Sequence, residues 1–142
     1  MDMNEQGEIF LAGHTTSNTE NWDVYTIKLN NEGEVIWEDK TGNPRGFNPL
    51  YIHDEAWGIK ATNDGGCVTV AGTGDEYNNY SECNSNGCSD IWNAYLIKYD
   101  HDGTISWEAT YSPSDIGEED YDWAGEDIAL TSDSLIKKEI WI

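Results

Sequence analysis

Apolar and polar residues alternate in short stretches along most of the chain, which is typical of β-strands with one buried face. In Val24–Leu29, the even-numbered residues share one face and the odd-numbered residues share the other. We find no stretch with a convincing helical period. The predicted strands are Ile9–Ala12, Val24–Leu29, Glu34–Glu38, Ile59–Thr62, Cys67–Ala71, Ala94–Tyr99, Thr104–Glu108 and Ile128–Thr131.

Tight turns with glycine join some of these strands, and long loops join the others. Asn30–Gly33 and Asp100–Gly103 are predicted hairpin turns, with glycine at the position that requires positive φ, and Asn63–Gly66 is a third tight turn. In an antiparallel arrangement, these turns lie at one end of the sheets. We therefore expect the opposite end to carry the long loops, which are 14–21, 39–55, 73–91 and 109–124.

The chain contains an internal duplication, which is its strongest architectural signal. Three segments recur in the same order along the chain. They are Gly7–Gly13 with Gly66–Gly72, Trp22–Lys28 with Trp92–Lys98, and Ile59–Asp64 with Ile128–Asp133. The two copies of the second segment lie farther apart in the chain than the two copies of the first, which indicates an insertion in one loop of the second repeat.

Each repeat holds four predicted strands, and tandem four-stranded antiparallel units are the blades of β-propellers. The predicted fold class is all-β, with about two blades per chain in a permuted register. The first repeat, 7–64, starts at a second strand, and the second repeat, 65–133, carries a long insertion at 74–91. Residues 134–142 form a further strand or a tail.

A consensus of turn, strand and aromatic residues underlies both repeats. It consists of Thr62–Gly66, Val70–Gly72 and Asp23–Lys28, followed by Gly33, Val35 and Trp37. This pattern resembles the β-propeller repeats of exported and surface proteins of bacteria, related to PQQ-like and kelch-like propellers. The resemblance implies a propeller scaffold, an extracytoplasmic location and no shared catalytic residues. Met1–Gln6 lacks the features of a signal peptide.

Two blades do not close a ring, because propellers typically have four to eight. Alone, they would leave broad apolar sheet faces and open strand edges. We expect either a fragment of a larger propeller or a ring completed by a homo-oligomer. In the oligomer, Glu126–Thr131 of one chain completes the blade begun by Ile9–Ala12 of the next. A trimer of six blades is favoured over a dimer of four or a tetramer of eight.

Charge narrows the range of partners. The 142 residues include 28 acidic and 7 basic side chains, and the formal net charge is −21. This charge disfavours nucleic acid, whose phosphates a binding protein must neutralise, and it equally disfavours anionic membranes. Much of the negative excess lies in the inserted loops and turns, so the long-loop end is predicted to be acidic.

Aromatic residues gather in or beside the long loops, where a rigid scaffold usually carries its binding site. Aromatic rings stack on sugars and anchor protein interfaces. The predicted function is therefore a non-enzymatic module that binds a partner or a glycan there; the alternative is a structural unit whose aromatic residues only pin loops or join chains. The candidate ligand-binding residues are Arg45, Tyr51, Trp57, Tyr77, Tyr80, Tyr111, Tyr121 and Trp123. Trp22, Trp37, Trp92 and Trp107 are predicted to pack between blades instead.

Carboxylates crowd one long loop and make it a candidate Ca²⁺ site, because Ca²⁺ takes six to eight oxygen ligands. The candidate ligands are Asp115, Glu118, Glu119, Asp120 and Asp122. The alternative is a solvated acidic loop. Asp100 and Asp102 resemble the start of a calcium loop, but the downstream glutamate is not at the required distance, which favours a plain hairpin turn.

The three cysteines fit no zinc site. Cys83 and Cys88 bracket a short turn, so a disulfide is sterically plausible and requires an oxidising compartment. In a reducing cell they are two free loop cysteines. Cys67 is predicted to be a buried small apolar residue within a strand.

Catalysis has little support in the sequence. His14 and His53 fall in predicted long loops, and His101 lies in a tight turn at the other end. Nothing in their spacing selects a triad with a serine and an aspartate. A hydrolase or lyase remains the alternative to a binding module.

Overall fold

The computed structural model describes residues 1–16, 22–43, 52–75, 92–112, 123–130 and 136–137. This described part is all-β and is dominated by two four-stranded antiparallel sheets, which confirms the predicted fold class. Sheet 1 consists of β1 (Asp2–Met3), β2 (Ile9–Thr15), β3 (Asp23–Leu29) and β4 (Val35–Thr41). Sheet 2 consists of β5 (Ile52–Ala61), β6 (Cys67–Asp75), β7 (Asn93–Tyr99) and β8 (Ile105–Tyr111). The short strands β9 (Ala129–Leu130) and β10 (Ile136–Lys137) pair with each other.

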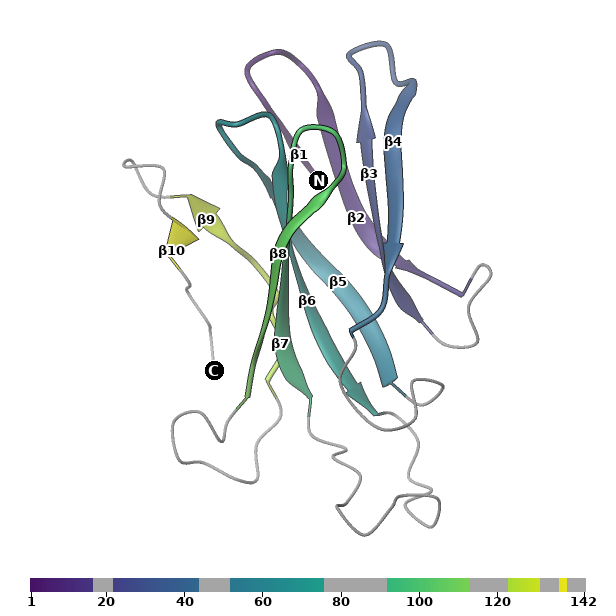
Figure 1. Ribbon diagram of the computed structural model, residues 1–142, viewed down its shortest axis with the longest axis vertical. Helices are drawn as coiled ribbons and strands as arrows, with labels where there is room; N and C mark the ends of the chain where they lie inside the picture. The colour runs from purple at the N-terminus through teal and green to yellow at the C-terminus, as the bar shows by residue number, and fades with distance from the viewer. Residues whose placement is uncertain (17–21, 44–51, 76–91, 113–122, 131–135, 138–142) are drawn as a thin grey trace, which may run out of the picture.

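Both sheets are meanders, with their strands in chain order from β1 to β4 and from β5 to β8. Figure 1 shows that the hairpins of both sheets lie at one end, at the top of that view, and that the long connections leave from the other end. We call these the turn end and the loop end. Within the described ranges, no helix is long and apolar enough to cross a membrane.

Four hairpin turns at the turn end share one geometry. Their glycines, Gly7, Gly33, Gly65 and Gly103, have φ angles of 80°, 84°, 81° and 87°. In each turn the glycine N–H donates to the carbonyl oxygen three residues earlier, as from Gly33 to Asn30 at 3.1 Å. Positive φ is the reason that glycine is needed there. The turn at Gly7 is not indicated by the sequence pattern, and the turn predicted at 63–66 closes one residue earlier, at 62–65.

The shared turn geometry corrects the first match of the duplication. Gly7 corresponds to Gly65 rather than to Gly66, because these two glycines close equivalent turns. The register agrees: Ile9 lies opposite Leu29 in sheet 1, and Cys67 lies opposite Tyr99 in sheet 2. The sequence match is wrong by one position, and in a strand such a slip moves every side chain to the opposite face. The insertion in the second repeat is accordingly longer by one position than the sequence match indicates.

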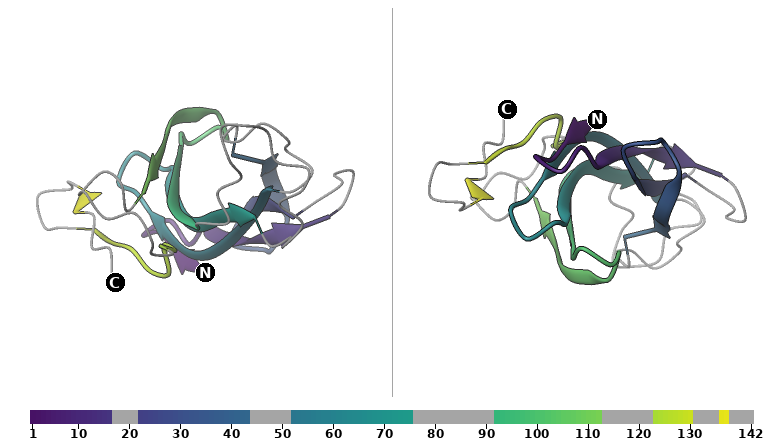
Figure 2. Two further views of the ribbon diagram at one scale, coloured as in Figure 1. Left: turned by 90° about the horizontal axis from the view of Figure 1, so that it is seen from below. Right: turned by 90° about the horizontal axis from the view of Figure 1, so that it is seen from above.

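The main core lies in the seam between the two sheets, which are seen along their strands in Figure 2. β5 packs against β1, β2 and β3. Sheet 1 contributes Phe10 and Val24, and the half-buried Trp37 packs against the same cluster. Sheet 2 contributes its facing residues, which are Ala56, Ile59, Ala61, Cys67, Ala71, Tyr95, Ile97 and Tyr99. A hydrogen bond of 3.2 Å between the hydroxyls of Thr26 and Thr69 satisfies both buried groups across the seam.

A bulge near the start of β4 breaks the simple alternation predicted there. Val35 lies opposite Leu29, whereas Trp37 lies opposite Lys28. These two β4 residues therefore point to opposite faces of sheet 1, although their spacing predicts one shared face. The same bulge recurs in sheet 2, where Tyr99 pairs with Ile105 and Lys98 pairs with Trp107.

Residues 123–130 pack against the face of sheet 2 that points away from sheet 1. Ile128 joins Val68, Val70 and Leu96 in a second apolar cluster. Because sheet 2 is covered on both faces at β7, every residue of β7 is buried, whereas β3 in sheet 1 alternates between buried and half-buried. Residues 123–130 therefore cover sheet 2 as β5 covers sheet 1.

Two strands differ from the sequence pattern. β5 begins at Ile52 rather than at the predicted Ile59. The sequence pattern misses its first half because the buried acids Asp54 and Glu55 interrupt the apolar alternation there. β1 spans only Asp2–Met3, too short for a periodic pattern, yet it pairs with the start of β2.

Candidate functional site

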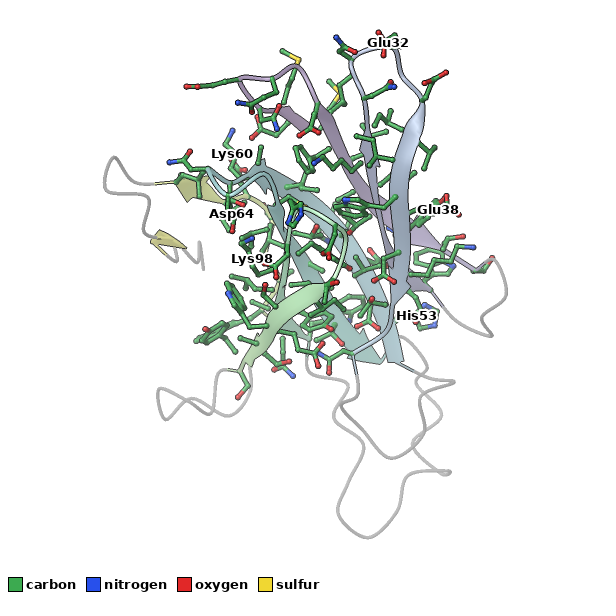
Figure 3. All side chains as sticks on the ribbon, turned by 45° about the horizontal axis from the view of Figure 1, so that its top comes forward. Glu32, Glu38, His53, Lys60, Asp64 and Lys98 are labelled. Atoms are coloured by element: carbon green, nitrogen blue, oxygen red, sulfur yellow. The ribbon has the colours of Figure 1, made fainter. Side chains whose placement is uncertain are left out.

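Four aromatic side chains meet near the loop end of the seam. The rings of His14 and Trp22 stack with centroids 4.8 Å apart, and Trp57 lies edge-on to His14 at 6.4 Å. The ring of His53 lies edge-on to Trp22 at 5.5 Å. We call His14, Trp22, His53 and Trp57 the aromatic patch. Figure 3 labels the buried His53 on this side of the molecule, away from the turn at Glu32.

Trp57 is the most accessible large ring of the patch. It sits at an irregularity of β5, between Ala56 and Gly58, where the pairing with β6 shifts register. A bulge of this kind turns a side chain out of the regular ladder, and bulges are frequent beside binding sites. Its exposed fraction is 57%, whereas the preceding Ala56 is buried in the seam. The bulge thus presents a tryptophan to solvent between two buried neighbours, Ala56 and Gly58.

A buried polar network fixes the backbone around the patch. Asp54, only 1% exposed, accepts the N–H of Asn43 at 2.9 Å. The side-chain amide of Asn43 donates to the hydroxyl of Thr110 at 2.7 Å, so β8 is connected to a residue just after β4. Asp54 also donates its own N–H to the carbonyl oxygen of Trp22 at 2.8 Å. These contacts hold the start of β5 beside Trp22 and preorganise the patch.

Across the same seam, Tyr99 donates its hydroxyl to Asp39 at 3.0 Å. Burial is the main cause that raises the pKa of Tyr99 above the ordinary tyrosine value. Burial likewise raises the pKa of Cys67 to about 12, so this cysteine is a neutral thiol at physiological pH. It is free and fully buried, as the sequence predicts.

Among the described residues, the shortest ion pair lies at the opposite, turn end. Lys98 contacts Asp64 at 2.8 Å, and Figure 3 shows the two residues close together. Burial acts to raise the pKa of Asp64, but hydrogen bonds from Lys98, Thr62 and the Gly66 N–H outweigh burial and lower that pKa to about 2. The pair joins the turn after β5 to β7 and is remote from the aromatic patch.

Three of the predicted ligand-binding residues lie in the described part, and the structure separates them. Trp57 belongs to the aromatic patch. Tyr111 is half-buried against the second apolar cluster, and Trp123 is buried, with 6% exposed. Arg45, Tyr51, Tyr77, Tyr80 and Tyr121 lie outside the described residues, as do Cys83 and Cys88 and the calcium candidates Asp115, Glu118, Glu119, Asp120 and Asp122.

The sequence does not single out the partners of Trp57. Its pattern assigns Trp22 to packing between blades, and it offers both histidines only as catalytic candidates. One feature of the sequence could have brought His14 and Trp22 together: they lie at the two ends of the connection between β2 and β3. The neighbouring residues Thr15 and Asp23 form a directly paired position of these two strands.

The candidate calcium-loop start at Asp100 and Asp102 is an ordinary hairpin turn. The Asp102 carboxylate accepts the Thr104 N–H at 3.0 Å, and the main-chain carbonyl oxygen of Asp100 accepts the Gly103 N–H at 3.1 Å. In the described ranges, no three histidine, cysteine, aspartate or glutamate side chains gather as metal ligands would.

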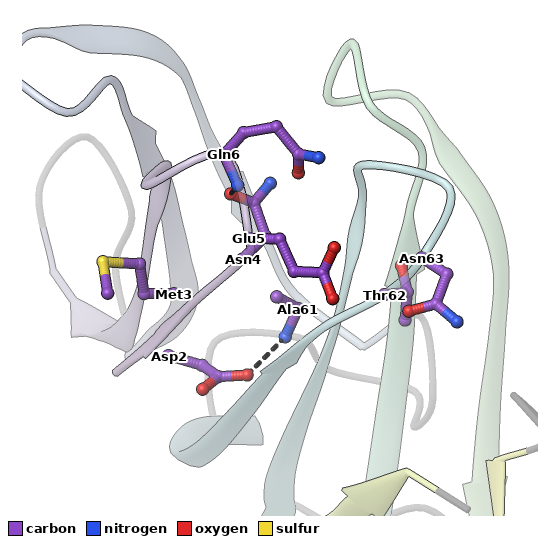
Figure 4. Close-up of a pocket in the computed structure, with 8 residues that line it drawn as sticks. All are labelled: Asp2, Met3, Asn4, Glu5, Gln6, Ala61, Thr62 and Asn63. Atoms are coloured by element: carbon purple, nitrogen blue, oxygen red, sulfur yellow. Dashed lines mark hydrogen bonds between the residues drawn. The ribbon is translucent and has the colours of Figure 1, made fainter. Parts of the chain in front are cut away.

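A polar hollow of about 370 Å³ lies at the turn end, between the turn after β1 and the turn after β5 (Figure 4). Asp2 lines it and is already engaged, because it accepts the Ala61 N–H at 2.9 Å and contacts Lys60 at 3.4 Å. The hollow lacks the apolar, enclosed walls of a typical ligand pocket. The aromatic patch is therefore the better candidate site.

No protein-family model matches this sequence, and no curated protein aligns with it significantly.

Proposed function

We propose that this protein is a non-enzymatic β-propeller module, of the bacterial repeat type described above, that binds a ligand through the aromatic patch. The observation that carries the proposal is Trp57, a tryptophan that is 57% exposed at a bulge and lies beside His14. A ligand that covers this ring removes a large apolar area from water, which favours binding. The polar network behind the patch supports this role, because it fixes the ring positions before any ligand arrives.

A neutral glycan is the ligand class that fits this surface. The apolar face of a sugar ring stacks on an exposed tryptophan. The net charge of −21 opposes ligands that carry their own negative charge, such as sialylated or sulfated glycans. We therefore expect uncharged sugars to bind and acidic sugars to bind more weakly.

We propose a non-enzymatic role because the side chains that could catalyse a reaction, in the part of the chain that the structure describes, are packed against other groups or buried. His14 stacks on Trp22, and His53 is buried against the same ring. Cys67 is a buried neutral thiol with its pKa raised to about 12, which removes the thiolate that nucleophilic catalysis requires. His101 lies at the turn end, in the turn between β7 and β8.

The test is an array of neutral and acidic glycans, followed by calorimetric titration of the strongest binder. Trp57→Ala should weaken binding by about 2 kcal/mol, roughly 30-fold, as truncation of an aromatic anchor does. Ile36→Ala is the matched control, because Ile36 is also exposed and apolar, at 48%, but lies on β4 outside the patch. Trp57→Ala binding as tightly as the wild type, or an array with no neutral binder, would refute the proposal.

A further inference from the structure

The outward face of sheet 1 is apolar and is only half-buried in the described structure. Its residues alternate with those that form the seam: Leu11 lies opposite Ile27, and Ile9 lies opposite Leu29. Met3 and Val35 extend this face and are 63% and 58% exposed. We call this surface, made by Met3, Ile9, Leu11, Ile27, Leu29 and Val35, the leading face.

The outward face of sheet 2 is covered only in part. Residues 123–130 cover Val68, Val70 and Leu96, whereas Trp107 on β8 remains 37% exposed. Trp107 and its neighbour Lys98 form one pair of the β7–β8 ladder. We call the surface made by Val68, Val70, Leu96, Lys98 and Trp107 the trailing face.

The internal seam is a template for joining these two faces. Leading-face residues Ile27 and Leu29 correspond in the second repeat to Ile97 and Tyr99, which are buried in the seam. The corrected alignment of the first segment places Leu11 on Thr69, also in the seam. Even the local contacts repeat: Tyr25 donates its hydroxyl to Glu38 at 2.5 Å, and Tyr95 does the same to Glu108 at 2.5 Å.

The other side of the seam repeats as well. Trp37 donates its ring N–H to the carbonyl oxygen of His101 at 3.1 Å and packs against Tyr99, and Lys28 donates to the carbonyl oxygen of Gly65 at 3.0 Å. The corresponding residues on the trailing face are Trp107 and Lys98. Trp107 thus occupies the position of a seam tryptophan, but no second sheet covers it in the described structure.

Two strand edges show the same incompleteness. β5 pairs with β6 from Ile52–Asp75 to Ala61–Cys67, whereas β1 covers only Ile9 and Phe10 of β2. On the other side, β9 pairs with β10 only at Ala129 and Leu130, although the segment that packs on sheet 2 begins at residue 123. The edge of β2 beyond Phe10 is therefore open to a further strand.

We propose that copies of this chain associate head to tail, with the leading face of one copy on the trailing face of the next. Residues 123–130 of the first copy pair with β2 of the second, and the short strands β1 and β10 give way to this longer ladder. Lys98 then donates to the carbonyl oxygen of Gly7 in the next copy, as Lys28 donates to Gly65 in the seam. Trp107 donates to the carbonyl oxygen of Asn31 in the next copy, as Trp37 donates to His101. The interface is heterologous, so rotation can close it into a ring.

A second copy is the occupant because the match is residue by residue. In the seam, sheet 2 covers the inward face of sheet 1. The leading face of sheet 1 carries the residues that correspond to this covering face of sheet 2, and the trailing face carries the residues that correspond to the covered face of sheet 1. This association is independent of the ligand site, since Trp57 belongs to neither face. Loss of glycan binding and loss of association are therefore separate results.

The experiment uses one substitution on each face and measures mass by sedimentation equilibrium at micromolar concentration. Ile27→Glu places a charge on the leading face, and Trp107→Glu places one on the trailing face. Ile36→Glu is the matched control. Its counterpart Ser106 in sheet 2 is exposed even though the seam is formed, so a charge at position 36 should not disturb the proposed interface. Circular dichroism checks the fold, and Leu29→Glu replaces Ile27→Glu if that variant unfolds.

The wild type and Ile36→Glu should sediment as assemblies, and each face variant alone should sediment as a monomer. A mixture of the two face variants should form a one-to-one dimer and nothing larger, because one intact leading face and one intact trailing face remain. A monomeric wild type, face variants that assemble like the wild type, or a mixture that stays monomeric would each overturn the proposal.

Discussion

Asp54 donates its main-chain N–H to the carbonyl oxygen of Trp22 at 2.8 Å, and this bond attaches the first strand of sheet 2 to sheet 1. The same bond recurs from Trp123 to the carbonyl oxygen of Trp92, also at 2.8 Å. Trp92 is the counterpart of Trp22 in the second repeat, and Trp123 takes the place of Asp54. The start of residues 123–130 is therefore attached to sheet 2 by the same kind of bond that attaches β5 to sheet 1.

The packing of residues 123–130 on sheet 2 predicts the cost of adding a methyl group at Gly125. A Cβ atom there would lie 2.1 Å from Cγ2 of Val70 and 3.2 Å from the carbonyl oxygen of Ala71. Gly125→Ala should lower the free energy of unfolding by about 1–3 kcal/mol, the usual cost of overpacking. Gly13→Ala is the control, since no atom lies within 4 Å of a Cβ there. Urea denaturation measures both; equal stabilities would place residues 123–130 elsewhere.

Trp37 and Trp107 occupy the same place in the two repeats but differ in cover. Trp37 packs against Tyr99 with ring centroids 5.4 Å apart, whereas Trp107 is 37% exposed. In dilute monomer, Trp37→Ala should lower the free energy of unfolding by about 3 kcal/mol, because it leaves a cavity in the seam. Trp107→Ala should cost about 1 kcal/mol or less. Thermal unfolding of both variants checks this, and the reverse order would show that the seam is misplaced.

Turn chemistry and strand alternation explain why most of the fold is predictable. β3 and β7 contain the aromatic and β-branched residues that favour strands, and the positive φ of Gly33 and Gly103 requires glycine at those positions. The alignment of β2 with β6 is misleading in the sequence because Val-Ala-Gly at 70–72 matches Leu-Ala-Gly at 11–13 by residue type. Backbone geometry at Gly7 and Gly65, which residue identity does not encode, decides the true alignment.

The candidate site is less predictable for a physical reason. Trp57 is identified by its residue type, but its exposure comes from a register shift in β5, which depends on pairing with β6. His14 and Trp22 come together because β2 and β3 pair side by side up to Thr15 and Asp23. Such tertiary juxtaposition leaves no periodic signal in the chain.

Acid should weaken the turn end through Asp64. Its pKa is lowered to about 2 from the ordinary 3.8, so the folded state favours the carboxylate. The resulting stability is present above the unfolded pKa and is lost as the pH falls through the folded pKa, which places the loss between about pH 4 and pH 2. Asp64→Asn should therefore show a shallower decrease of stability in this range. Urea unfolding at a series of pH values measures it; parallel curves for the two proteins would exclude the effect.

Alkali should destabilise the seam. Burial raises the pKa of Cys67 to about 12, and burial also holds the pKa of Tyr95 and Tyr99 above that of a free tyrosine. A raised folded pKa gives stability that is complete below the unfolded value and is lost as the pH rises through the folded one. Stability should therefore stay level up to about pH 9 and decrease above it. Tyr99→Phe should reduce the slope; tyrosinate absorbance that rises in the folded protein near the ordinary pKa for all tyrosines would contradict this.

Residues 123–130 are attached to sheet 2 by a main-chain hydrogen bond of the kind that attaches β5 to sheet 1, and we propose that they begin a further unit. Residue-resolved amide hydrogen exchange by NMR tests this attachment, because the structure gives a hydrogen bond to the N–H of Trp123, of Gly125 and of Asp54. We predict that all three amides exchange far more slowly than those of an unstructured chain. Protection of Asp54 together with unprotected exchange at Trp123 and Gly125 would contradict the claim.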